Sequence, residues 1–272
     1  YDVIAMTHFY AAEMLTYLKR KGYDLPPTVF IGTDYTCTPF TMETDCDKYV
    51  IPAEDLCGEY IKQGATREQL LPYGIPVSRV FEPKETDIAA LRGQLGLHPD
   101  KQCVLAMGGS MGAGKMKQLT AKLIRYGNEN PDTQFVIICG TNEKLRRILT
   151  EKTAGDNSFT ILGFTDRMHD YMAAADIFIT KPGGLSSTEA AVSRVPIVHM
   201  SPIPGCETKN VKYFASHGMS LSLKKMKIEQ ALDKLKDREV CRSIVESQRR
   251  NISSAAGRIC DLLENMANKK VS

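Results

Sequence analysis

The stretch of residues 181–204, KPGGLSSTEAAVSRVPIVHMSPIP, indicates the fold of this chain. An apolar run at residues 176–180 precedes it and is short enough to be a buried strand. A Pro-Gly-Gly turn follows, then a helix expected over residues 187–193 and a second apolar run at residues 197–200. A strand, a glycine turn and a helix N-terminus in this order present free backbone N–H groups and the positive end of a helix dipole. This arrangement suits an anion, and a phosphate in particular.

Glu189, in the first turn of the expected helix, has two interpretations. It follows Ser186 at the spacing of a capping box, in which its carboxylate would accept a hydrogen bond from the Ser186 backbone N–H. Alternatively, the carboxylate could accept hydrogen bonds from a ribose diol, as an acidic residue does in dinucleotide-binding folds. The two roles do not exclude each other.

The composition is that of an ordinary globular protein, with 272 residues of which 43% are hydrophobic and 25% charged. The net charge of +3 is too small to argue for a nucleic-acid partner. The eight cysteines are scattered without a C-x-x-C pair, so we expect a reducing compartment, no disulfide framework and no metal site. No apolar run reaches the length of a transmembrane helix. Because the chain opens without Met in strand-like sequence, we expect its first residues to be missing.

Apolar runs alternate with amphipathic helical segments through most of the chain, which predicts an α/β fold with doubly wound parallel sheets. The Pro- and Gly-rich segment 70–83 predicts a boundary between two domains. We therefore expect a partial N-terminal domain at residues 1–84, a second domain at 85–240 and a charged helical tail at 241–272. A single helix is expected over residues 54–63.

One glycine loop resembles a known phosphate-binding motif. Residues 109–115, GSMGAGK, nearly match the phosphate loop of nucleotide triphosphatases, but Met116 stands where a hydroxyl would coordinate magnesium. A glycine turn whose N–H groups approach a diphosphate, or a plain strand-to-helix turn, fits this sequence better.

Polar residues also follow strands elsewhere, where ligands of parallel sheets bind. His8 ends the first strand and could be an acid–base group, and Asp34, in GTDY, could bind a hydroxyl or support a general base. The alternatives are a structural histidine and a turn aspartate that accepts local N–H groups. Glu207 and Asn210 could meet the hydroxyls of a polar ligand or only begin the next helix. His199 lies late in a strand run and is expected to be structural.

Several motifs together resemble those of family-28 glycosyltransferases. They occur in the order GGSMGAGK, LGFTDRMHDYMAAADIFITKPGG, STEAAVSRVPIVH and PGCETKNVKYFASHG. The first part, with GTDYTCTPF, KYVIPAEDLCGEYIKQG and YGIPVSRVFEP, is similar to the diacylglycerol glycosyltransferase branch, the processive glucosyl- and monogalactosyl-diacylglycerol synthases. The resemblance covers nearly the whole chain. It implies the GT-B fold, in which two Rossmann-like domains face each other across a cleft, with the N-terminal one incomplete here.

The resemblance also implies roles for individual residues. Glu189 matches the acidic residue that holds the donor ribose, and Thr165 matches the position whose backbone reads the uracil edge. The other implied donor-site residues face the diphosphate (Gly109, Ser110, Gly183, Gly184 and Ser186) or the hexose hydroxyls (Glu207 and Asn210). Asp34 matches a position on the acceptor side, and with His8 it is a catalytic candidate.

The implied function is transfer of a hexose from UDP-glucose or UDP-galactose to a membrane lipid acceptor, with diacylglycerol as the expected acceptor. No metal and no cofactor are expected. The glycine loop with the histidine base of the family has no counterpart in this chain, and Thr38 stands where several relatives carry His. We expect a cytoplasmic protein, peripheral on the inner face of the membrane. A peptidoglycan-precursor N-acetylglucosaminyltransferase, a UDP-sugar epimerase, or a donor-binding module without activity of its own are the alternatives.

Overall fold

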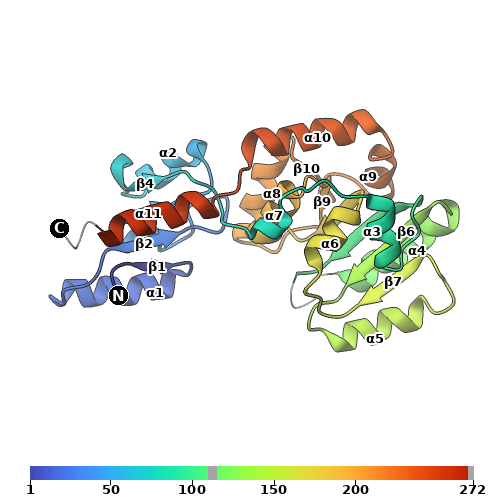
Figure 1. Ribbon diagram of the computed structural model, residues 1–272, viewed down its shortest axis with the longest axis horizontal. Helices are drawn as coiled ribbons and strands as arrows, with labels where there is room; N and C mark the ends of the chain where they lie inside the picture. Colours follow the sequence, from blue (N-terminus) through green and yellow to red (C-terminus); the bar gives the residue numbers. More distant parts are fainter. Residues whose placement is uncertain (110–114, 269–272) are drawn as a thin grey trace. The chain divides into compact units, whose positions relative to one another are not determined.

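The computed structural model describes residues 1–109 and 115–268 and divides into two compact units. Unit 1 comprises residues 1–79 and 251–272, and unit 2 comprises residues 80–250. The break after residue 79 lies inside the Pro- and Gly-rich segment 70–83. Each unit is built on its own parallel sheet (Figure 1).

Unit 1 contains a four-stranded parallel sheet in the order β1-β2-β3-β4. Its strands are β1 (Ile4–Met6), β2 (Thr28–Ile31), β3 (Lys48–Val50) and β4 (Leu70–Leu71). Its helices are α1 (Phe9–Arg20), α2 (Cys57–Lys62) and α11 (Ala256–Asn268), with 3₁₀ turns η1 (Thr41–Glu43), η2 (Glu54–Leu56) and η3 (Arg67–Gln69); a further turn, η4 (Arg79–Phe81), follows at the break.

Two expectations for unit 1 were wrong. The segment expected as one helix over residues 54–63 is the 3₁₀ turn η2 followed by the short helix α2. Residues 70–71, expected in a linker, form β4, because Leu70 and Leu71 pair with Tyr49 and Val50 of β3.

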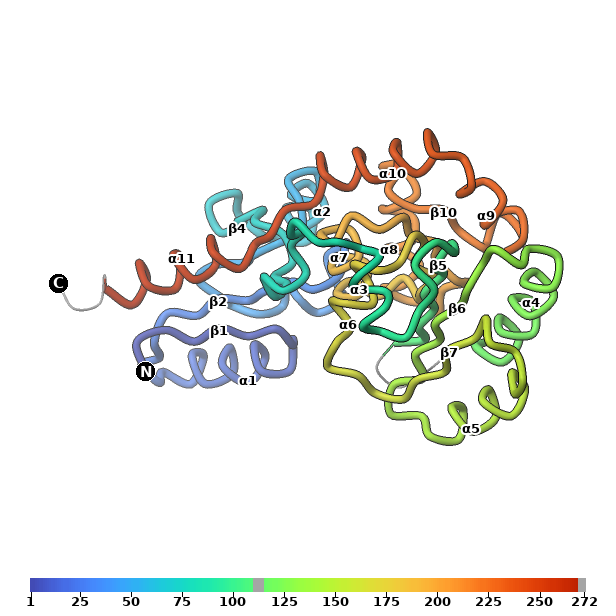
Figure 2. Tube along the Cα trace, turned by 45° about the vertical axis from the view of Figure 1, so that its right-hand side comes forward, coloured from blue at the N-terminus to red at the C-terminus, as the bar shows by residue number. Residues whose placement is uncertain are grey.

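Helix α11 packs on the sheet of unit 1 instead of forming a separate tail. Ala255 and Ile259 are buried against Val29, Ile31 and Val50 of the sheet. The next apolar positions of the helix pack on the same cluster: Leu262, Leu263 and Met266. The ribbon and the Cα tube both show α11 running alongside β2 (Figures 1 and 2). The expected segment 241–272 is thus divided, since its first part continues a helix of unit 2.

Unit 2 contains a six-stranded parallel sheet in the order β10-β9-β8-β5-β6-β7. Its strands are β5 (Gln102–Met107), β6 (Thr133–Ile138), β7 (Phe159–Leu162), β8 (Ile177–Thr180), β9 (Ile197–His199) and β10 (Ser220–Ser222). Its helices are α3 (Ile88–Gln94), α4 (Met116–Glu129), α5 (Glu143–Lys152), α6 (Met168–Ala174), α7 (Gly184–Val192), α8 (Cys206–Ser216), α9 (Ile228–Lys234) and α10 (Arg238–Asn251).

The central strands of unit 2 are buried on both faces. Every residue of β6 and β8 is buried, so these strands are continuous apolar runs without alternation, as expected where helices cover both sides of a parallel sheet. Side chains of α4, α5 and α9 complete the core on one side, and Phe135 stacks on Phe159 with ring centroids 4.7 Å apart. The predicted doubly wound α/β fold is confirmed.

The strand order of unit 2 reverses between β5 and β8. From β5 the chain proceeds through α4 to β6, whereas from β8 it proceeds through α7 to β9 in the opposite direction across the sheet. Because parallel crossovers are right-handed, α4 and α7 cover opposite faces of the sheet. The crevice between the loops after β5 and β8 is the place where such sheets bind ligands.

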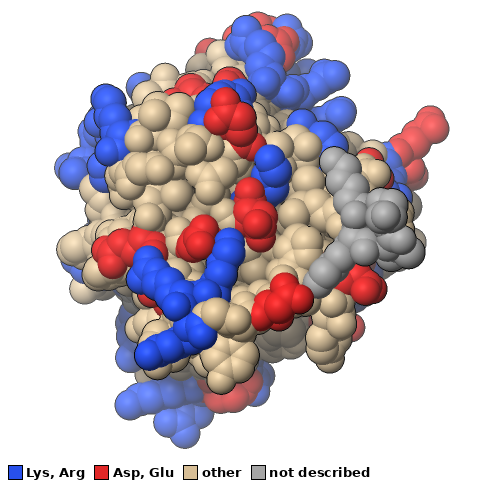
Figure 3. Space-filling model, turned by 90° about the vertical axis from the view of Figure 1, so that its left-hand side faces the viewer, with Lys and Arg blue, Asp and Glu red and all other residues tan. Residues whose placement is uncertain are grey.

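The surface carries both signs of charge. On the coloured part of the face shown in Figure 3, Lys and Arg side chains are interspersed with Asp and Glu. This agrees with the small net charge of +3.

Candidate functional site

The loops after β5 and β8 come close to each other at the point of strand reversal. Gly109, after β5, has φ of +79°, a left-handed conformation that favours glycine. A Cβ atom added to Gly109 would lie 3.1 Å from Cε of Lys181, which follows β8. The left-handed φ therefore favours glycine here, and a Cβ atom would also require the Lys181 side chain to shift by a few tenths of an ångström. Ser110 and the rest of the phosphate-loop-like motif up to residue 114 lie outside the described residues.

Helix α7 begins earlier than expected, so the capping-box interpretation of Glu189 was wrong. The N-cap is Gly183 and the first helical residue is Gly184, which places Ser186 inside the first turn and Glu189 in the second. Thr188 donates from its Oγ1 to the Gly184 carbonyl at 2.7 Å. The N-cap makes no side-chain hydrogen bond, so the N–H groups of the first turn are not capped by it. A helix start of this kind, in the turn that follows Lys181, suits an anion.

Glu189 carries a half-buried carboxylate that has no hydrogen-bond or ion-pair partner among the described residues. Burial raises the pKa of this carboxyl group. An unpartnered carboxylate is costly to bury, and hydroxyl groups of a ligand would supply the hydrogen bonds that it lacks. This is the environment expected of a ribose-binding residue, and that role stays a prediction.

Residues of α8 support the turn before α7. Asn210 is fully buried and its side-chain nitrogen donates to the carbonyl of Pro182 at 3.0 Å. Glu207 accepts from Lys181 Nζ at 3.1 Å and from the backbone N–H of Ile203 at 2.9 Å. The structure therefore brings both residues to the turn, where each has a structural partner, and their contact with a hexose stays a prediction.

Lys181 is a site residue that the sequence interpretation did not single out. Its side chain is about one-fifth exposed, lies against Gly109 and is oriented by Glu207. The signal was present in the sequence, since a lysine stands between the end of a buried strand and the Pro-Gly-Gly turn. It places a positive charge where the anion is expected.

Thr165 lies beyond the edge strand β7, at the same carboxyl edge of the sheet. Its Oγ1 accepts a hydrogen bond from the Arg167 N–H at 3.1 Å. The neighbouring Phe164 is 71% exposed, an unusual position for a large apolar ring. The reading of a uracil edge by the Thr165 backbone stays a prediction.

The two catalytic candidates lie at the carboxyl edge of the unit 1 sheet. His8 follows β1, is exposed and caps α1 by accepting the Tyr10 N–H on Nδ1 at 3.3 Å. Asp34 lies in the turn after β2, half-buried, and its carbonyl accepts the Thr36 N–H at 2.8 Å. His8 thus has the local structural role weighed as the alternative, and the catalytic roles of both residues stay predictions.

His199 is structural, as expected. It is fully buried in β9, and its ring nitrogens lie 2.9 Å from Ser187 Oγ of α7 and 3.1 Å from Ser220 Oγ of β10. Burial lowers the pKa of this imidazole to about 3, so it is neutral, and it joins α7 to β9 through Ser187 and β9 to β10 through Ser220.

Among residues 1–109 and 115–268 there is no group of three or more His, Cys, Asp or Glu side chains that could hold a metal ion. No helix in this part of the chain is both long and apolar enough to span a membrane.

Comparison with protein families gives two matches. Residues 1–77 match monogalactosyldiacylglycerol (MGDG) synthase, and residues 103–254 match the glycosyltransferase family 28 C-terminal domain. The chain belongs to glycosyltransferase family 28. The second match contains the strand reversal, the glycine turn and Glu189, so these features are the family 28 part of the chain.

Curated relatives within this family are processive diacylglycerol beta-glucosyltransferases. That of Staphylococcus saprophyticus is 34% identical over 193 residues, covering 71% of this chain and 48% of the relative. That of Staphylococcus carnosus is 30% identical over 218 residues, covering 80% of this chain and 54% of the relative. The chain thus spans about half the length of the curated relatives that it matches.

Solved structures support the GT-B fold of this family 28 member. MurG of Acinetobacter baumannii gives a TM-score of 0.71 at 19% identity, with 97% of this chain and 73% of MurG covered. HepE of Anabaena in complex with UDP gives 0.63 at 16% identity, with 97% and 79% covered. The expected GT-B fold is confirmed.

Proposed function

We propose that the protein transfers a hexose from a UDP-sugar to a hydroxyl group of a membrane lipid, with diacylglycerol as the acceptor. The names of the curated relatives and of the family matched by residues 1–77 support this acceptor. The bound UDP in the HepE structure supports the donor nucleotide. UDP-glucose and UDP-galactose both fit this proposal.

The observation that carries the proposal is the unpartnered, half-buried carboxylate of Glu189 in α7. It lies in the second turn of the helix whose N-terminus faces the point of strand reversal. Two ribose hydroxyls would satisfy the two carboxylate oxygens while the diphosphate lies at the helix N-terminus.

The diphosphate would be held by groups that the chain already orients. The uncapped N–H groups at the start of α7 donate to phosphate oxygens, and Lys181, positioned by Glu207, adds a positive charge. These groups would stabilise the negative charge that develops on UDP as it leaves. Asn210 would keep the turn in place through Pro182.

The transfer forms a bond between the acceptor oxygen and the anomeric carbon and breaks the bond from that carbon to the β-phosphate oxygen. The hydroxyl proton passes to a general base. Asp34 and His8 are the candidates of this chain for that step, on the carboxyl edge of the unit 1 sheet. Glu207 and Thr165 are proposed to contact the hexose and the uracil.

Helix α1 offers a surface for the proposed contact with a membrane. Tyr10, Met14 and Tyr17 are 66%, 69% and 60% exposed and share one stripe of the helix. The buried residues of α1, Ala12 and Thr16, lie on its other side, so the stripe points away from the sheet. Tyrosines are enriched at membrane–water interfaces. We propose that this stripe rests on the inner, cytoplasmic face of the membrane.

A vesicle-binding experiment tests this surface. A variant with Tyr10, Met14 and Tyr17 all replaced by Ser should bind vesicles of phosphatidylglycerol and phosphatidylcholine about tenfold more weakly in co-sedimentation, since it loses the apolar area that inserts. Ile61→Ser, at a 44% exposed position of unit 1, is the control. Equal binding by the triple variant and the wild type would refute the role of α1.

Calorimetry with UDP tests the donor site. We expect UDP to bind, ADP to bind far more weakly, and Glu189→Ala to lower the affinity for UDP about tenfold or more, as two hydrogen bonds to a charged group are lost. A folded chain that does not bind UDP would overturn the proposal. Product analysis with diacylglycerol, with a peptidoglycan precursor and with UDP-sugar alone separates the transferases from an epimerase and from a donor-binding module.

A further inference from the structure

The loop after β7 is covered by an ion pair from α5. Gly163 comes directly after β7 and begins this loop, and Thr165 is the residue of the loop that is proposed to contact the uracil. A Cβ atom added to Gly163 would lie 3.2 Å from Glu143 Oε1 and 3.3 Å from Arg146 Cδ. Both side chains therefore lie against the backbone of Gly163, closer than a side chain at this position would leave undisturbed.

The position of the start of α5 explains why these two side chains reach the loop. β6 and β7 end level with each other, since the Cys139 N–H donates to the Leu162 carbonyl at 2.8 Å. Helix α5 begins at Glu143, and the side chain of its N-cap, Asn142, accepts the Leu145 N–H at 2.9 Å. The first turn of α5 thus lies at the carboxyl edge of the sheet, beside the end of β7.

Glu143 fixes the orientation of Arg146. Its Oε2 accepts a hydrogen bond from Arg146 Nε at 2.8 Å and lies 2.7 Å from Nη2, so it engages one side of the planar guanidinium. Among the described residues Arg146 has no other hydrogen-bond or ion-pair partner, which leaves its remaining N–H groups available to a ligand. The Arg146 side chain is 47% exposed, and an ion pair at such a position contributes little to stability. The pair thus presents oriented donors at the carboxyl edge of the sheet.

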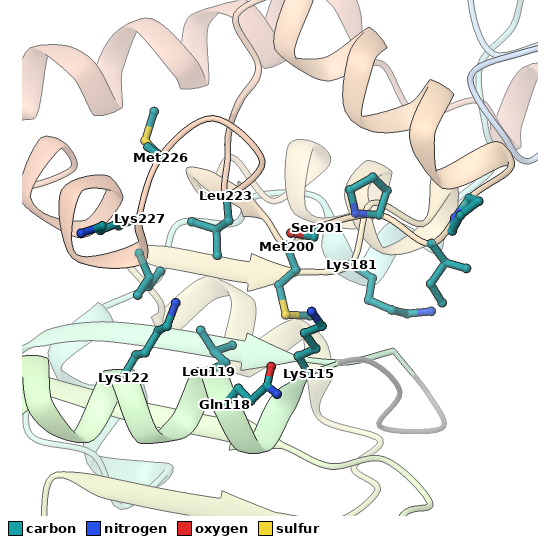
Figure 4. Close-up of a pocket in the computed structure, with 14 residues that line it drawn as sticks. Lys115, Gln118, Leu119, Lys122, Lys181, Met200, Ser201, Leu223, Met226 and Lys227 are labelled. Atoms are coloured by element: carbon teal, nitrogen blue, oxygen red, sulfur yellow. The ribbon is translucent and has the colours of Figure 1, made fainter.

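This part of the edge is distinct from the pocket beside α4. Figure 4 shows Leu119 of α4 and Leu223 on opposite sides of that pocket. The described lining of the pocket includes Lys181, but no residue of α5 and none of residues 163–165. Arg146 therefore lies on the loop after β7 without belonging to that pocket.

We propose that Arg146 determines the choice of base, by donating to the O4 carbonyl oxygen of a uracil whose edge lies along residues 163–165. This inference rests on the proposed function, because it specifies how the UDP site of that proposal recognises its base. Arginine carries only donors, so it favours O4 of uracil over the amino group that cytosine carries at the same ring position. Cytosine would leave the guanidinium facing another donor, which is the kind of mismatch that polar sites reject. Glu143 is the positioning residue of Arg146.

Calorimetry of the full chain with UDP and with CDP tests the choice of base. Arg146→Met should lower the affinity for UDP about tenfold, because a hydrogen bond to a charged donor is lost, and should leave the affinity for CDP unchanged or raised. Arg147→Met removes the same charge from the next, exposed position of α5 and should keep the ratio of the two affinities. An equal loss for UDP and CDP in Arg146→Met would indicate attraction of the diphosphate alone and refute the choice of base. Unchanged affinities for both would refute the contact.

A double-mutant cycle tests the positioning role of Glu143. Glu143→Ala should lower the ratio of UDP affinity to CDP affinity about threefold in the wild-type background and leave it unchanged in Arg146→Met, because Glu143 acts through Arg146. The same loss in both backgrounds would overturn this role. A folded wild type that binds neither nucleotide refutes the proposed function and this inference with it. A wild type that binds UDP, with an unchanged ratio in Arg146→Met, refutes this inference alone.

Discussion

Replacing Arg92 by Ala should destabilise unit 2 strongly. Arg92 lies in α3 and is 6% exposed. Its guanidinium donates to the carbonyls of Ala174 at 2.9 Å, Pro99 at 2.9 Å and Lys101 at 3.1 Å, and to Asp176 Oδ2 at 2.8 Å. Asp176 Oδ2 also accepts the Cys103 N–H at 2.7 Å, so the pair joins α3 to the beginnings of β5 and β8.

The size of the effect follows from what the substitution leaves behind. Breaking a buried ion pair costs about 3–5 kcal/mol, and the three carbonyls lose their donor as well. The side chain of Asp176 is 46% exposed, so water recovers part of this loss. We expect Arg92→Ala to lower the free energy of unfolding by about 3 kcal/mol, which for a unit of this size lowers the melting temperature by roughly 6–12 °C.

The assay is thermal unfolding by circular dichroism, with hydrogen exchange of peptides from β5 and β8 to assign the transition to unit 2. Arg146→Ala is the matched control, because its ion pair with Glu143 lies at the surface and should leave the melting temperature nearly unchanged. UDP affinity of folded Arg92→Ala should equal that of the wild type, since Arg92 acts at the amino ends of the strands. A shift no larger than that of Arg146→Ala would refute the reasoning.

Three further predictions concern the edge that carries the candidate site. Burial lowers the pKa of His199 to about 3, so between about pH 6.5 and pH 3 only the unfolded chain takes up this proton. Between pH 7 and pH 5 the free energy of unfolding, measured in urea, should therefore fall by about 2 kcal/mol more for the wild type than for His199→Asn. An equal dependence on pH for the two proteins would contradict this. Gly109→Ala should lower the free energy of unfolding by about 1–2 kcal/mol because of the left-handed φ, and should also lower the affinity for UDP in calorimetry. An unchanged affinity for UDP would show that the loop does not contact the diphosphate. Lys181→Met should lower the affinity for UDP about tenfold and leave the affinity for uridine unchanged. An equal loss of affinity for UDP and uridine would argue against a contact with phosphate.

The strands of unit 2 could be predicted closely because they are buried on both faces. The run at residues 177–180 and its neighbours are apolar without interruption, a pattern that needs no knowledge of tertiary contacts. Strand β4 could not be found in this way. It has only two residues, and it exists because Leu70 and Leu71 meet β3.

The start of α7 was misjudged because three good capping residues follow the glycines. The structure uses Gly183 as the N-cap, and Ser187 and Thr188 are buried, with Ser187 beside His199. Local preference favoured the hydroxyl residues, but the partner of Ser187 lies on another strand and is invisible to a local pattern. The burial of Asn210 and the pairing of Lys181 with Glu207 likewise depend on how α8 packs.

The position of α11 has a consequence for how the protein emerges from the ribosome. Unit 1 contains the first residues of this chain, yet its core closes only when Ala255 and Ile259 reach Val29 and Val50. During synthesis one apolar face of the unit 1 sheet therefore stays uncovered while all of unit 2 is translated and can fold as a unit. The newly made segment 1–79 is thus the part of unit 1 that a chaperone would protect, and pulse proteolysis of stalled nascent chains should find it cleaved until α11 has left the exit tunnel.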